Sequence, residues 1–185
     1  MANPERPTAI DGLHHAPQHR LNTQEDTMPS FVADRVVAAP ADLAWAVVAD
    51  LAGYARIAPG LSHVEILGGD GQGLRRRCYD SRGRGWNETC TLWEPGRRYR
   101  MQVDTASYPF PLRQLLRAFQ GTWSVNPVPE GTRITVGFDA QPRLGLLGRL
   151  ALRAMGGKAD RDLTQLLDNY EHAIRARNSA GRPSV

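Results

Sequence analysis

The chain has 185 residues, enough for one domain with a substantial core. Its hydrophobic fraction of 41% is ordinary for a globular protein, and no apolar run approaches the roughly 20 residues of a membrane span. The formal net charge is +4, but no nucleic-acid motif or aromatic-basic platform accompanies it, so we expect no nucleic-acid partner. No apolar signal segment follows Met1, and we expect a cytoplasmic protein.

The chain is predicted to begin with a tail, followed by one strand and two short helices. Residues 1–29 are polar and lack periodicity, which predicts a disordered N-terminal tail. Residues 31–38 predict the first strand. Pro40 then opens a helix at its first turn, where proline is tolerated. Residues 54–58 predict a second short helix, which ends before a Pro-Gly pair.

After a second strand around residues 64–67, an antiparallel meander is predicted from Leu74 to Val103. Two tight turns, Gly83-Arg84-Gly85 and Glu94-Pro95-Gly96, separate its three strands, because glycine permits the positive φ of short loops. The meander carries charged residues on both faces, whereas a sheet packed only on a dry core keeps one face apolar. This pattern indicates that the meander lines a pocket.

Positive charge is concentrated between Arg75 and Arg117. This stretch holds ten arginines against four acidic residues, while the rest of the chain has 13 basic against 15 acidic residues. An anionic ligand or a membrane surface can use such a field, and solvated strand arginines give the same count.

The second half of the chain predicts a loop, two strands and a long helix. Residues 106–112 form an apolar loop with two prolines, which is either a lid, a membrane-touching edge or a segment packed back on the core. Strands are predicted over 119–125 and 132–140. The helix has an apolar face formed by Leu163, Leu166, Leu167, Tyr170 and Ile174. Gly156-Gly157 marks either a kink or a break in it, and residues 178–185 are predicted to be a disordered tail.

This order of elements predicts an α+β fold. An amphipathic helix must bury its apolar stripe, and the concave face of the sheet is the only surface large enough. One helix cannot fill a strongly curved antiparallel sheet of six to seven strands. A cavity between the sheet and the helix is therefore expected, closed at one end by the two short helices.

Several motifs resemble those of a known family. They are Asp50-Leu-x-x-Tyr54-x-x-x-x-Pro59-Gly60, Trp86-x-Glu88, Trp93-Glu94-Pro95-Gly96-Arg97-Arg98 and the stretch from Gly121-Thr-Trp123 to Gly131-Thr-Arg133. Together with the element order, they resemble the START-like (SRPBCC) superfamily, and within it the polyketide cyclase/dehydrase branch. The resemblance covers about Phe31 to Ile174. It implies the helix-grip fold and a ligand-binding domain over 30–177 with a hydrophobic cavity, but no single activity.

The pairing of the first hairpin decides which residues meet. A three-residue loop at 83–85 would place Cys78 opposite Cys90 and Asp80 opposite Glu88. The cysteines are expected to be thiols in a reducing cytoplasm, although a cross-strand disulfide is conceivable. Two close carboxylates repel unless one is protonated or an arginine lies between them, so Asp80 and Glu88 form either a proton-transfer pair or an ion-pair ladder. A two-residue loop would exchange the faces.

Strand parity then gives a candidate site with apolar walls and a small charged group. Arg76 and Glu88 are the candidate catalytic residues, and the resemblance makes Arg76 the counterpart of a pocket arginine in aromatic-ring-forming cyclases. Gly60-Leu61-Ser62 stands where that comparison leads us to expect a tyrosine. Leu92 is also predicted to face inward. The candidate ligand-binding residues are Asp80, Trp86, Tyr99, Met101, Phe119, Trp123, Phe138 and Met155.

Three functions remain open. The first is the binding of a hydrophobic small molecule, such as a lipid, an isoprenoid quinone or a polyketide. The second is a cofactor-independent polyketide cyclase, aromatase or dehydratase, and the third is a regulatory or toxin-like interaction module. We expect no cofactor and no metal, since the sequence has no metal-ligand spacing, phosphate loop or Ser-His-Asp set. The expected partners are the ligand and, transiently, a membrane; the protein would be a monomer or a homodimer.

Overall fold

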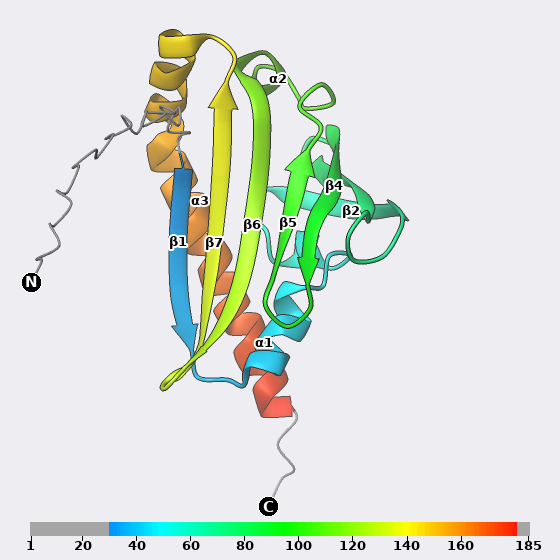
Figure 1. Cartoon of the computed structure of the whole chain (residues 1–185), viewed down its shortest axis with the longest axis vertical. Coiled ribbons are helices and arrows are strands. Elements are labelled where there is room, and N and C mark those ends of the chain that lie inside the picture. Colours follow the sequence, from blue (N-terminus) through cyan, green and yellow to red (C-terminus); the bar gives the residue numbers. More distant parts are fainter. Residues whose placement is uncertain (1–29, 181–185) are drawn as a thin grey trace, which may run out of the picture.

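The computed structural model describes residues 30–180, except for the side chains of Ser30 and Met155. The predicted tail at 1–29 lies outside the described residues. Figure 1 shows the chain from its first strand to its long last helix. In order, the elements are β1 (Ser30–Val37), α1 (Ala41–Val48), the 3-10 helix η1 (Tyr54–Arg56), β2 (Leu61–Gly68), β3 (Arg75–Asp80), β4 (Gly85–Glu94), β5 (Arg98–Val103), α2 (Leu112–Leu115), β6 (Leu116–Val128), β7 (Gly131–Pro142) and α3 (Gly145–Ala180).

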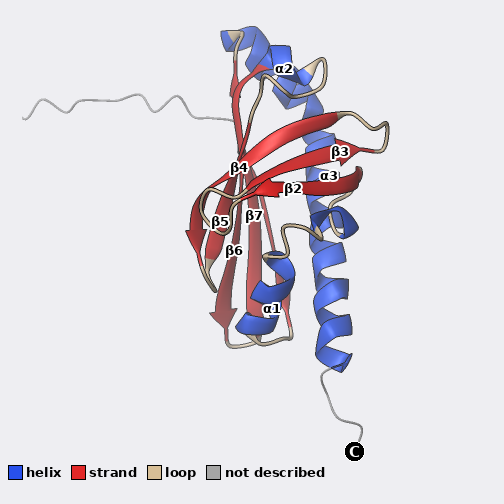
Figure 2. Cartoon of the chain, turned by 90° about the vertical axis from the view of Figure 1, so that its right-hand side faces the viewer, coloured by secondary structure: helices blue, strands red, loops and turns tan. Residues whose placement is uncertain are grey.

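The seven strands form one antiparallel sheet in the order β1-β7-β6-β5-β4-β3-β2. Figure 2 shows that β2, β3 and β4 run across the direction of β6 and β7, so the sheet is strongly twisted and curved. Helix α3 packs against β1, β7 and α1. The predicted α+β helix-grip fold, with two short helices after the first strand, is confirmed. None of the helices in residues 30–180 is long and apolar enough to cross a membrane.

The core lies between α3 and the sheet. The apolar stripe of α3 is buried as its spacing predicted: Leu163, Leu166, Leu167, Tyr170 and Ile174 are each at most 3% exposed. They meet the inward residues of β6 and β7, among which Val125, Ile134 and Val136 are buried. This packing fixes α3 along one half of the sheet.

The pairing of β3 with β4 differs from the prediction. Arg76 lies opposite Glu88 and Cys78 opposite Trp86. The chain reverses earlier than the sequence suggested, because the amide of Asp80 donates to the carbonyl of Arg84 at 3.0 Å. The predicted opposition of Cys78 to Cys90, and of Asp80 to Glu88, is therefore wrong. The displacement is an even number of residues, so the predicted inward face is kept.

A β-bulge in β4 reverses the alternation in the second half of the strand. The register with β5 shifts between Cys90 and Leu92, and Leu92 then pairs with Arg100 while Trp93 pairs with Tyr99. Because a bulge inserts one extra residue, the side chains beyond it exchange faces. The prediction that Leu92 faces inward is wrong. Trp93 takes the inward place and packs on Trp45, with ring centroids 5.4 Å apart.

Helix α3 runs without interruption through the glycine pair. It spans 36 residues from Gly145 to Ala180, so neither a break nor a separate short helix is present at Gly156-Gly157. Residues 178–180, which the sequence assigned to the tail, belong to this helix. A Cβ atom at Gly157 would meet no other atom within 4 Å, and one at Gly156 would make an ordinary contact with Phe31. The helix backbone therefore accommodates the two glycines, but its conformation does not require them.

Replacing Gly157 by alanine should therefore stabilise the protein. Glycine in a helix interior costs about 1 kcal/mol relative to alanine, and no neighbour opposes the added methyl group. We expect Gly157→Ala to raise the free energy of unfolding in a urea titration by about that amount. An unchanged or lowered value would mean that α3 is not continuous at this position in solution.

Candidate ligand-binding cavity

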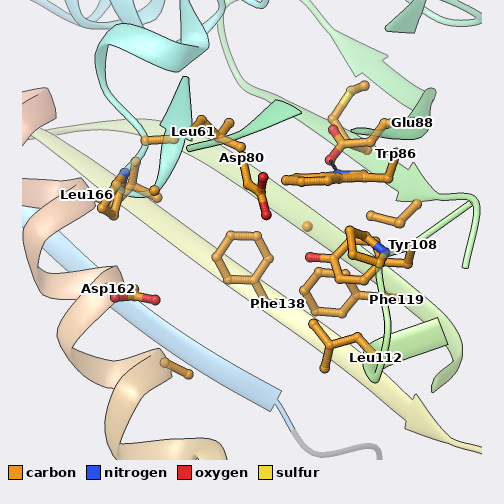
Figure 3. Close-up of a pocket in the computed structure, with 18 of the residues that line it drawn as sticks. Leu61, Asp80, Trp86, Glu88, Tyr108, Leu112, Phe119, Phe138, Asp162 and Leu166 are labelled. Carbon is orange, nitrogen blue, oxygen red and sulfur yellow. Dashed lines mark hydrogen bonds between the residues drawn. The ribbon is translucent and has the colours of Figure 1, made fainter. Parts of the chain in front are cut away.

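A cavity of about 780 Å³ lies between the sheet, the η1–β2 connection, the loop at 108–112 and α3. Figure 3 shows its side chains converging from these elements. Eight predicted site residues line it: Arg76, Asp80, Trp86, Glu88, Met101, Phe119, Trp123 and Phe138. Helix α3 contributes Lys158, Ala159, Asp162, Leu163 and Leu166, and the η1–β2 segment contributes Tyr54, Ala58, Pro59, Gly60 and Leu61.

Aromatic rings make up much of the wall. Phe119 stacks on Phe138 at 5.7 Å, and Trp123 stands perpendicular to Phe138 at 5.5 Å. These rings close over β6 at Gly121, where a Cβ atom would lie 2.6 Å from the Trp123 ring. Only glycine leaves room for this arrangement, in which the rings present both faces and edges to the cavity.

An ion pair forms the polar end of the cavity. The Arg76 Nε donates to Glu88 Oε2 at 2.8 Å, and Nη2 lies 2.7 Å from the same oxygen. Arg76 Nη1 donates to the carbonyl of Leu51 at 3.3 Å, and the guanidinium lies 4.6 Å from the centroid of the Tyr54 ring. The Trp86 indole donates to the other carboxylate oxygen, Oε1, at 2.7 Å. Strands β3 and β4 and the α1–η1 segment therefore meet at one charged pair.

Arg76 remains charged in this setting and is shielded from a ligand. Burial alone lowers the pKa of Arg76, but the Glu88 carboxylate outweighs it and the pKa lies above its usual value. The Arg76 side chain borders the cavity with 0% exposure, whereas that of Glu88 is 9% exposed. Each carboxylate oxygen has a second lone pair. A ligand group that reaches this end would thus meet Glu88, with Arg76 behind it.

Asp80 lines the rim of the cavity instead of pairing with Glu88. Its carboxylate accepts from the amides of Arg84 and Arg82 and forms an ion pair with the Arg84 guanidinium at 2.7 Å. These contacts, the Arg84 amide first, lower the pKa of Asp80. The predicted carboxylate pair is therefore absent, and Asp80 instead stabilises the β3–β4 turn as an anion.

Tyr99 belongs to the core and does not line the cavity. It is fully buried, its hydroxyl donates to the carbonyl of Val48 at 3.0 Å, and its ring stacks on Trp123 at 4.9 Å. Its inward direction was predicted correctly, but it lies one layer deeper than the ligand surface. The side chain of Met155, the other candidate from the apolar list, lies outside the described residues.

The loop at 108–112 supplies cavity residues that sequence reasoning did not assign to the site. The Tyr108 ring packs against Trp86 at 5.0 Å and lies 6.1 Å from Phe119. Burial, followed by the Glu88 charge, raises the pKa of Tyr108, so its hydroxyl stays protonated and can donate. The two prolines and aromatic residues at 106–112 were the available signal. They left a lid, a membrane-touching edge and packing on the core all open, and they gave no side-chain direction.

The two cysteines are free, buried thiols. Burial, with the Glu88 charge next, raises the pKa of Cys78 to about 12, and burial also raises the pKa of Cys90. Neither residue lines the cavity. Within residues 30–180, no three His, Cys, Asp or Glu side chains are close enough to hold a metal ion.

The fold and this cavity define a helix-grip protein with a largely apolar site that opens to the surface. Residues 28–174 match the sequence model of the family described as polyketide cyclase / dehydrase and lipid transport, and the chain belongs to that family. The predicted SRPBCC membership, in its polyketide cyclase/dehydrase branch, is confirmed. No curated protein sequence matches the chain.

Solved structures share the fold at low sequence identity. The Zhui aromatase/cyclase from Streptomyces sp. R1128 is 24% identical, with a TM-score of 0.65 over 83% of this chain and 98% of that one. TTHA0849 from Thermus thermophilus is 21% identical, with a TM-score of 0.63 over 80% and 99%. The di-domain ARO/CYC BexL is 24% identical, with a TM-score of 0.61 over 78% of this chain and 47% of that one. This chain thus corresponds to about one half of BexL.

The buried pair makes a testable energetic prediction. Glu88→Gln would leave the Arg76 cation buried without its anion, and breaking such a pair typically costs about 3–5 kcal/mol. We expect a loss of that order in the free energy of unfolding. The double variant Arg76→Met, Glu88→Leu removes both charges and should recover much of it, because apolar replacements of a whole buried pair are often neutral. If the double variant lost as much free energy of unfolding as the two single variants together, this account would be contradicted.

Proposed function

We propose that the protein binds a hydrophobic small molecule whose hydroxyl or phenol group donates to Glu88. The observation that carries this proposal is the convergence of apolar walls on the Glu88 carboxylate, the most buried of the three carboxylates that line the cavity. Arg76 and Trp86 hold Glu88 through both of its oxygens. The anchor is therefore preorganised, and a ligand does not have to order it on binding.

The dimensions and lining favour a multi-ring or isoprenoid ligand. Small-molecule sites commonly enclose about 300–1,000 Å³ with apolar walls and a few polar groups, and this cavity encloses about 780 Å³. The rings of Phe119, Phe138 and Trp123 offer faces and edges to a flat aromatic partner. A polyketide, an isoprenoid quinol or a hydroxylated lipid has this combination of apolar body and donating group.

The charge of Glu88 also selects against some ligands. A ligand carboxylate at this end would face an anion whose nearest cation, Arg76, is already paired and shielded. Like charges in a poorly solvated site repel strongly. Arg82 and Arg84 lie at the rim instead. An acidic ligand would therefore have to keep its carboxylate at the mouth.

Blocking the cavity tests the binding proposal. Ala159 lines the cavity from α3, whereas Ala154 is exposed on the same helix and does not line it. Ala159→Trp should weaken the binding of a hydroxyanthraquinone by about tenfold or more, because the added ring occupies ligand volume. Ala154→Trp should leave it unchanged. Tryptophan fluorescence titration gives both affinities, and unmodified protein should bind an anthraquinone carboxylate more weakly. Equal binding by both variants would contradict the proposed site.

A second candidate is a cofactor-independent cyclase, aromatase or dehydratase that acts on a polyketide. The favouring observation is that a carboxylate and a phenol, Glu88 and Tyr108, border the same space. Their opposite roles, acceptor and donor, suit the removal and return of a proton at a bound carbonyl compound. The Zhui aromatase/cyclase has the same fold. In this candidate the aromatic walls would also hold the chain folded for ring closure.

Glu88→Asp tests the catalytic candidate without removing the charge beside Arg76. Shortening the side chain withdraws the carboxylate from the cavity, and proton transfer requires hydrogen-bond reach. Turnover of a poly-β-ketone substrate should fall about 100-fold or more, while Glu65→Asp, the same shortening at an exposed residue of β2 that does not line the cavity, should retain it. Product chromatography reports turnover, and thermal melts of both variants confirm folding. Full turnover in folded Glu88→Asp would leave ligand binding as the function.

A further inference from the structure

An exposed apolar patch lies at the end of the molecule where α3 begins. Leu146 and Leu147 are 72% and 76% exposed, and Leu144 and Leu150 are more than half exposed. Phe110, in the loop before α2, is 62% exposed. We call these five residues the apolar tip. Monomeric proteins rarely expose a group of this many large apolar side chains unless a partner binds there.

The first turns of α3 carry large apolar residues on the side that faces away from the core. Gly148 and Leu152 are buried on the inner side. Because side chains advance by about 100° per residue, Leu146 and Leu150 lie on the opposite, outer side. Leucine thus occupies the outward face of a helix whose inner face is already packed, and core packing does not explain it.

The tip is one structural unit. The amide of Arg143 donates to the carbonyl of Leu115 at 2.8 Å, and its side chain donates to the carbonyl of Leu116 at 2.7 Å. Leu116 and Leu152 share a small core of their own. Figures 1 and 2 both place α2 beside the start of α3.

The two segments that carry the tip are basic. Residues 105–118 and 141–157 contain no Asp or Glu. The same two segments contain the arginines Arg113, Arg117, Arg143, Arg149 and Arg153, all of them exposed. Leucine and phenylalanine flanked by arginine is the composition of helices that lie in the interface of an anionic bilayer. A second copy would bring the same arginines against this surface, and like charges repel.

The tip is continuous with the cavity mouth. Phe110 is exposed and also lines the cavity, together with its neighbours Tyr108 and Leu112. The mouth therefore opens beside the surface that carries the leucines. Contact of this surface with a bilayer would bring the cavity close to the acyl region.

We propose that the apolar tip docks on the surface of an anionic membrane and turns the cavity mouth toward the lipid. The leucines and Phe110 enter the headgroup boundary, and the arginines pair with lipid phosphates. The docking does not require a ligand in the cavity. Its test is therefore independent of the small molecule that the protein binds.

Vesicle flotation of the full chain tests the proposal. We expect the protein to float with vesicles of phosphatidylcholine and phosphatidylglycerol, to float less at high salt, and to remain behind with pure phosphatidylcholine. Leu146→Glu with Leu147→Glu should reduce flotation about tenfold or more, because two apolar anchors become anions. Leu67→Glu, at an exposed leucine of β2, is the matched control and should not change it. Unchanged circular dichroism would show that the variants fold.

Three results would overturn the proposal. One is the absence of binding to the anionic vesicles, which would also follow if another segment of the chain covered the tip. Another is equal binding to neutral vesicles, which would remove the role of the arginines. The third is a dimer in analytical ultracentrifugation that the Leu146→Glu, Leu147→Glu change dissociates, because a second copy would then occupy the tip.

Discussion

The burial of one guanidinium sets the geometry of the ligand-facing end of the protein. Arg76 has no exposed surface, yet it keeps its charge by facing Glu88, the carbonyl of Leu51 and the ring of Tyr54. Removing such a cation from water costs several kcal/mol, which only well-placed partners offset. Those partners come from β4 and from the α1–η1 segment. The ion pair therefore requires that β3, β4 and the α1–η1 segment keep their positions relative to one another.

The cavity follows from where α3 makes its contacts. The helix packs on β1, β7 and α1, at one side of the curved sheet. The inward faces of β3 to β5 then lack a helical partner over part of their length. Aromatic rings and the loop at 108–112 cover this region without filling it. If this face of the sheet were covered by a tightly packed core, both members of the Arg76–Glu88 pair would have to be completely buried.

Periodicity was sufficient to predict the architecture but not the local registers. The stripe of α3 and the inward faces of β3 and β6 follow from spacings of three, four and two residues. The β3–β4 turn could not be placed from glycine alone, because Gly83 and Gly85 both suit a tight loop. Asp80 decided it by accepting from the amides of Arg82 and Arg84. The register error was an even number of residues, which is why Arg76, Asp80, Trp86 and Glu88 still line the cavity.

The remaining differences have physical causes that a single sequence does not display. The bulge after Cys90 exchanges Leu92 for Trp93 on the inner face, and both are plausible core residues. Tyr99 points inward as its parity predicts, but stacking on Trp123 places it beneath the cavity surface. Parity specifies a face and not a depth. Depth depends on which rings lie above, and these come from β6, distant in sequence.

Helix α3 combines two surfaces that impose opposite demands on its sequence. From Leu163 onward it presents a buried stripe to the sheet, and there its outer side is polar. In its first turns the outer side carries leucine, and only small or single residues such as Gly148 face inward. Because the helix is continuous through Gly156-Gly157, both surfaces belong to one helix. Between them, Lys158, Ala159 and Asp162 border the cavity. The leucines of the apolar tip, the cavity wall and the buried stripe therefore lie along one and the same helix.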